Sequence, residues 1–167
     1  MSESLQFVFA SIFVFCVVYA MVSDFSGLRI PNIVSILLVL AFAVYAAFGG
    51  GGELWQYMAL AVGVFVLMFV CFALGWLGAG DVKFLGAVIL WTGPAHSAAF
   101  LLLFALFSGG FALMLLALKS AQGYLPILAE LPVMEKFSRW ARNGLCPYGI
   151  PIGLAALCVA PSIFQLS

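Results

Sequence analysis

Charged side chains are scarce in this chain. Of its 167 residues, six are Lys or Arg and six are Asp or Glu, so 7% are charged while 66% are hydrophobic. A soluble domain of ordinary composition is roughly one quarter charged and about one half apolar. Because so few charges cannot cover a globule of this size, the composition excludes a soluble protein and a disordered chain. The excess hydrophobic surface must face lipid, and the length suits a single membrane domain covering residues 1–167.

Other functional classes lack the residues that they need. Six basic residues balanced by six acidic ones leave no basic surface for nucleic acid and no net charge to steer a partner. No two of the four cysteines form a CxxC pair, so we predict neither a zinc ribbon, a redox pair nor a disulfide-stapled module. The GxSxG, SxxK and HExxH motifs and the glycine-rich nucleotide-binding loops are also absent. We therefore expect neither a metal nor any other cofactor.

Six apolar runs predict an all-α, polytopic membrane protein with six transmembrane helices. The runs cover residues 5–22, 33–48, 54–75, 82–93, 95–118 and 148–164. The fourth run, between Asp81 and Pro94, gives only about 18 Å of helix, whereas the hydrocarbon core is about 30 Å thick. Either this short fourth helix spans only part of the membrane, or the loop before it already lies inside the membrane boundary. We expect a short outer loop with His96 after Pro94.

The basic residues orient the chain in the membrane. Six passes place every Lys and Arg on one side, whereas five passes would divide them between the two sides. Because cytoplasmic loops collect Lys and Arg, we predict six passes with both termini outside and cytoplasmic connections at 23–32, 76–83 and 119–147. In the last connection, residues 132–142 have the pattern of an amphipathic helix in the membrane interface. That helix is either a plain anchor or a lid that contacts substrate.

Two aspartates are the candidate catalytic residues. Asp24 follows the first apolar run and Asp81 precedes the fourth, so the predicted topology places both at the cytoplasmic face. Carboxylates at membrane depth are unfavourable and are by default candidates for a functional site. Gly78 and Gly80 give the backbone before Asp81 unusual freedom. In the alternative interpretation, Asp81 only caps a helix and Asp24 is a solvated turn residue.

A close pair of carboxylates suits hydrolysis of a peptide without a metal. Two adjacent carboxylates share one proton, so the ionised member deprotonates a water while the protonated member polarises the scissile carbonyl. Lys83 follows Asp81 by two residues. It is either a basic anchor at the membrane surface or an ammonium that favours one ionised carboxylate and so tunes the pair.

Three segments carry a resemblance to a known family. The sequence Gly-Ala-Gly-Asp at 78–81 fits the GxGD motif of polytopic aspartic proteases, and its continuation Val-Lys-Phe-Leu at 82–85 resembles type IV prepilin peptidases. Asp24 followed by Arg-Ile-Pro-Asn at 29–32 resembles their first aspartate segment. The sequence Pro-Tyr-Gly-Ile-Pro at 147–151 resembles the element that opens their last helix. Presenilin-type GxGD proteases are a poorer match.

The resemblance implies an aspartic endopeptidase that removes short basic leaders from prepilin or pseudopilin precursors at the cytoplasmic face. It implies Asp24 and Asp81 as the catalytic residues and the plasma (inner) membrane as the location. The chain lacks the large insertion with paired CxxC motifs of the bifunctional members, so N-methylation of the product is not expected. Its small size is closer to the stand-alone peptidases of tight-adherence (Flp) pili and to archaeal preflagellin peptidases. The expected partners are the precursor, the lipid bilayer and the pilus assembly machinery, with no nucleic acid.

A second hypothesis uses the same two aspartates differently. The protein could be a small transporter or pilus-assembly scaffold, in which Asp24 and Asp81 form a proton or cation site and the short fourth helix belongs to the carrier. The halves 1–80 and 81–167 share no obvious pattern, so no internal repeat supports this hypothesis.

Overall fold

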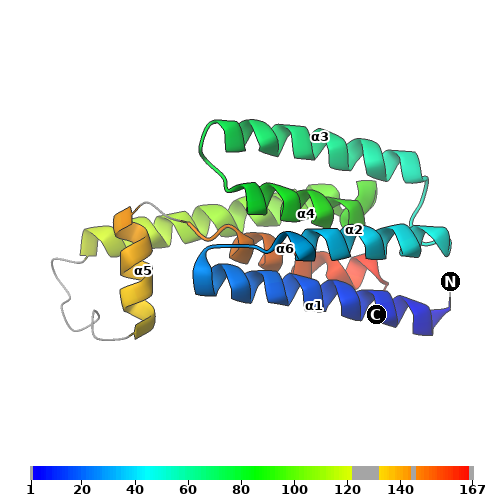
Figure 1. The fold of residues 1–167 in the computed structure, drawn as a ribbon, viewed down its shortest axis with the longest axis horizontal. Helices are drawn as coiled ribbons and strands as arrows, with labels where there is room; N and C mark the ends of the chain where they lie inside the picture. The colour runs from blue at the N-terminus through cyan, green and yellow to red at the C-terminus, as the bar shows by residue number, and fades with distance from the viewer. Residues whose placement is uncertain (1, 122–131, 144–145, 166–167) are drawn as a thin grey trace.

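The computed structural model describes residues 2–121, 132–143 and 146–165, and these residues form helices and connecting turns without a β-strand. The predicted all-α class is therefore confirmed. The helices are α1 (Glu3–Gly27), α2 (Asn32–Ala47), α3 (Leu54–Ala73), α4 (Ala79–Ala121), α5 (Pro132–Asn143) and α6 (Gly149–Ile163). Except for α5, they lie roughly along one common direction (Figure 1).

Helix α4 consists of two helical segments joined at Gly93. This glycine has φ 58° and ψ −176°, and the following Pro94 begins the second segment. Figure 1 shows the second segment running back past the first and projecting beyond it. A side chain at Gly93 would overlap the ring of Tyr57, and its positive φ also favours glycine. The expected outer loop is therefore wrong, because a single glycine reverses the chain and His96 already lies in helix.

Trp91 joins several helices at the centre of the bundle. Its indole N–H donates to the Leu38 carbonyl at 3.0 Å. Its ring lies 5.3 to 6.4 Å, centroid to centroid, from the rings of Phe9, Phe13, Phe42, Tyr45 and Phe164. These contacts tie α1, α2 and the end of α6 to the first segment of α4, whereas α3 packs mainly against α4.

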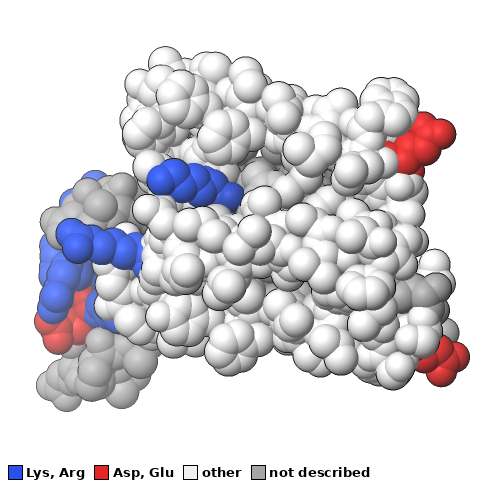
Figure 2. Space-filling view, turned by 45° about the vertical axis from the view of Figure 1, so that its right-hand side comes forward, with Lys and Arg blue, Asp and Glu red and all other residues white. Residues whose placement is uncertain are grey.

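The outer surface is apolar enough for a membrane. By length and composition, α1, α3 and residues 79–120 of α4 could each cross a bilayer, and α2 and α6 are shorter apolar helices. In Figure 2 most Lys and Arg gather at one end, and the surface between the two ends is uncharged except for one basic side chain in a recess. These features, with the composition, identify an integral membrane protein.

Helix α5 lies across the basic end of the bundle (Figure 1). Trp140 meets the ring of Phe25 edge-on at 5.6 Å, and both belong to a small hydrophobic cluster with Leu115 of α4. The Lys136 ammonium lies 4.5 Å from the Phe25 ring centroid and donates to the Ser26 carbonyl at 3.3 Å. The predicted amphipathic helix is confirmed, and its apolar face packs on α1 and α4.

Candidate active site

Asp24 lies in the last turn of α1 and is only 3% exposed. The helix ends because Leu28 adopts a left-handed conformation, φ 53°, and its N–H donates to the Asp24 carbonyl at 2.8 Å. The Ser23 hydroxyl donates to the Arg29 carbonyl, also at 2.8 Å, and so closes the turn. The chain after α1 is thereby folded back beside the Asp24 carboxylate.

Asp81 lies in the first turn of α4. Its Oδ2 accepts a hydrogen bond from the N–H of Gly78, the residue before the helix, at 3.1 Å. This is the reach-back contact of a capping box, in which the third helical residue bonds the N–H of the capping residue. The contact of Asp81 thus has the geometry of a helix cap, as the alternative interpretation expects, and it uses only one of the two carboxylate oxygens.

The two aspartates line one cavity. It has a volume of about 480 Å³ and is bounded by two segments, 23–32 from the last turn of α1 to the start of α2, and 78–81 at the start of α4. The segments touch, since a Cβ at Gly80 would lie 3.3 Å from the Ile30 carbonyl. The charge of Asp24 acts on Asp81. Burial, followed by the charges of Asp81 and Asp24, raises the pKa of the Cys146 thiol to about 11, so both carboxylates also face the segment before α6.

The glycines of the 78–81 motif are needed for space. A Cβ at Gly78 would lie 2.8 Å from Asp81 Oδ2, and one at Gly80 would crowd the Ile30 backbone. Neither glycine has a positive φ. Close packing therefore gives a reason for glycine at both positions, and the expected backbone freedom stays a prediction.

Gly149 also belongs to the site, although its contact with Asp24 was not predicted from the sequence. Its N–H donates to Asp24 Oδ2 at 2.8 Å, across 125 positions of the sequence. Because Gly149 begins α6, the positive end of that helix points at the carboxylate. The resemblance at 147–151 was the available signal, but the sequence alone did not join that segment to Asp24.

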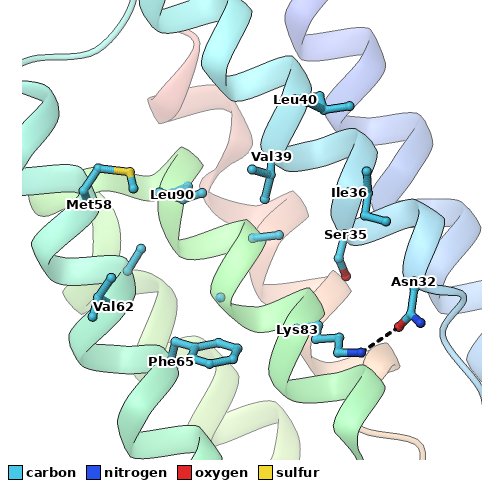
Figure 3. Close-up of a pocket in the computed structure, with 13 residues that line it drawn as sticks. Asn32, Ser35, Ile36, Val39, Leu40, Met58, Val62, Phe65, Lys83 and Leu90 are labelled. Atoms are coloured by element: carbon cyan, nitrogen blue, oxygen red, sulfur yellow. Dashed lines mark hydrogen bonds between the residues drawn. The ribbon is translucent and has the colours of Figure 1, made fainter.

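Lys83 does not line the dyad cavity, but its hydrogen-bond partner does. Its ammonium donates to Asn32 Oδ1 at 3.1 Å, at the mouth of an adjoining groove (Figure 3). Its tuning of the carboxylates stays a prediction. Glu135 forms an exposed salt bridge with Arg139 on α5, at 2.9 Å. In the part of the chain that the structure describes, no three His, Cys, Asp or Glu side chains are grouped so as to hold a metal ion.

The sequence profile of the type IV leader peptidase family matches residues 11–115. The chain belongs to the type IV leader peptidase family. The matched range contains both aspartates and the 78–81 motif, and it ends before α5 and α6. No curated protein and no solved structure matches the chain significantly.

Family membership, with the apolar helices, makes this protein a membrane peptidase. Within a type IV leader peptidase, a cavity with two facing carboxylates can supply both a general base and a general acid. One backbone N–H holds each carboxylate through Oδ2, and among the described residues no hydrogen bond occupies Oδ1, which a water or a peptide carbonyl could then contact.

Proposed function

We propose that this protein is an aspartic endopeptidase that removes the short basic leader from type IV pilin-like precursors, with Asp24 and Asp81 as its catalytic residues. The observation that carries the proposal is that two carboxylates distant in sequence line one cavity in a chain of this family. Neither aspartate forms a salt bridge among the described residues, so a shared proton is available for acid–base chemistry.

Hydrolysis proceeds by addition of water to the scissile carbonyl. The ionised carboxylate accepts a proton from the water while the water oxygen attacks the carbonyl carbon. The protonated carboxyl donates its proton to the carbonyl oxygen. When the tetrahedral gem-diol collapses, the C–N bond breaks and the leaving nitrogen takes the proton that the first carboxylate had accepted from water. A hydroxyl of the gem-diol returns its proton to the second carboxylate, so the pair again holds one proton. The products are a leader with a free carboxylate and a pilin with a new N-terminal amine.

We further propose that the cavity faces the cytoplasm at the plasma membrane. Basic side chains gather at the end of the bundle that holds the dyad (Figure 2), and cytoplasmic segments are enriched in Lys and Arg. Gln6 and Gln165 line a common cavity at the opposite end with the glycine turn at 49–52, which supports an even number of passes and termini outside. Six passes follow if both segments of α4 cross.

The test is co-expression with a candidate precursor and a gel-mobility assay of leader cleavage. Asp24→Asn and Asp81→Asn should each abolish cleavage, because an amide neither accepts the proton of water nor donates a carboxyl proton. Glu135→Gln is the matched control, since it removes an exposed carboxylate on α5 and should leave cleavage intact. Glu130→Gln should likewise leave cleavage intact; Glu130 lies outside the residues that the structure describes.

The same assay separates the peptidase from a transporter or assembly scaffold that uses the two aspartates. A transporter would leave a correctly inserted precursor uncut in the presence of the wild-type protein. Full processing by either Asn variant would refute the dyad.

A further inference from the structure

A groove that adjoins the dyad cavity, and shares Asn32 with it, opens between α2 and α3, with the first segment of α4 as its floor (Figure 3). Its volume is about 550 Å³. The walls are apolar, with Val39 on α2 and Val62 on α3, and the floor includes Gly86 and Ala87 of α4. Small floor residues and the separation of α2 from α3 leave this side of the bundle unfilled by the protein.

One end of the groove is polar and positively charged. The Lys83 ammonium lies there against Asn32 Oδ1, and the Ser35 hydroxyl is close to the same end in Figure 3. Within the described ranges, no carboxylate forms a salt bridge with Lys83. Lys83 is thus a cation at the mouth of an apolar groove, which is complementary to an amphipathic molecule with an anionic head.

The groove is long enough to hold much of one acyl chain. Its lining runs from Asn32 to Leu40 along α2, which is about 12 Å of helix. This length approaches one leaflet, or half, of a hydrocarbon core about 30 Å thick. The cation at its polar end favours an anionic lipid as the occupant.

We propose that this groove binds one anionic phospholipid, with its phosphate at Lys83 and Asn32 and an acyl chain along the groove between Val39 and Val62. A basic side chain between transmembrane helices near the membrane surface is a recognised type of site for anionic headgroups. The proposal concerns lipid binding and does not depend on the catalytic roles of the aspartates.

The experiment measures lipids retained by the full-length protein. The protein is reconstituted in vesicles of equimolar phosphatidylglycerol and phosphatidylcholine, extracted gently, and examined by native mass spectrometry. The wild type should retain phosphatidylglycerol preferentially. Lys83→Met should lower that retention about fivefold, the effect of one basic side chain near the membrane surface. Lys83→Arg should preserve it. The control Lys119→Met, which changes a lysine that does not line the groove, should leave it unchanged.

A second pair of variants tests the acyl-chain half of the site without changing charge. Val62 and Val66 are 57% and 55% exposed on α3, but only Val62 lines the groove. Val62→Trp should displace the retained lipid, whereas Val66→Trp should not. Wild-type retention by both Lys83→Met and Val62→Trp would overturn the proposal. So would a photoreactive residue at position 62 that crosslinks to added precursor and not to lipid, because the groove would then seat the substrate helix.

Discussion

Replacing Gly149 by alanine tests how closely the position of Asp24 is controlled. The Gly149 N–H donates to Asp24 Oδ2 at 2.8 Å. An added Cβ would lie 2.8 Å from the same oxygen, 2.9 Å from Asp24 Cβ and 2.8 Å from Ile30 Cδ1. Ordinary contacts of a Cβ begin at 3.4 Å, so the carboxylate or the start of α6 must move by about 0.6 Å.

The magnitude of the effect follows from that displacement. A catalytic group must be held within about 0.5 Å of its productive position, and a misplacement of about 1 Å can lower a rate about 100-fold. The movement also weakens a hydrogen bond to a charged group, which contributes about 1.5–3 kcal/mol. We therefore expect Gly149→Ala to lower kcat for leader cleavage by about 10- to 100-fold. Overpacking should lower the free energy of unfolding by about 1–3 kcal/mol.

The assay is cleavage of a co-reconstituted precursor by purified enzyme in liposomes, with thermal unfolding measured on the same samples. Gly27→Ala is the control, because it adds the same methyl group at the end of α1, where no atom lies within 4 Å of the new Cβ. Its kcat and Tm should match the wild type. A folded Gly149→Ala variant with wild-type kcat would refute the argument that this contact positions Asp24.

Two further predictions concern the fold and its orientation. Gly93→Ala should lower the free energy of unfolding by at least about 1–3 kcal/mol, because the positive φ disfavours a side chain there. Thermal unfolding checks this against the control Gly63→Ala, which adds its methyl group in open space. Equal Tm values for the two variants would contradict the prediction. In a cysteine-free background, single cysteines replacing Ser26 and Arg139 should react with an impermeant thiol reagent only from the cytoplasm, and one replacing Gly51 only from outside. Labelling of position 139 from outside would mean that one segment of α4 does not cross.

The pairing of Asp24 with Asp81 could be predicted from the sequence because it follows from topology. Apolar runs and the distribution of Lys and Arg place residues 24 and 81 at one end of the bundle, and a bundle is narrow enough for two such residues to meet. The cavity that both carboxylates line agrees with that expectation. The amphipathic helix at 132–142 could be predicted for a similar reason, because apolar residues that recur with the period of an α-helix fall on one face of that helix.

Contacts made by backbone atoms were not predictable in the same way. The Gly149 N–H that holds Asp24 leaves no mark in composition or periodicity, because every residue except proline carries an N–H. The reversal at Gly93 was missed for a related reason. A loop normally needs several residues, but one glycine with a positive φ followed by a proline turns this chain without a loop. The direction of the Lys83 side chain likewise depends on the angle at which α4 begins.

The means by which the fold holds its carboxylates suits the chemistry proposed for them. A buried aspartate is often stabilised by an arginine or a lysine, which favours the ionised form and opposes a shared proton. Here, among the described residues, each carboxylate is instead held by a backbone N–H at the start of a helix, Gly149 for Asp24 and Gly78 for Asp81. Such a helix end carries only about half an elementary charge. It can therefore position a carboxylate within an apolar bundle without fixing both members of the pair in the ionised state, and a pair that retains one proton is what general acid–base hydrolysis requires.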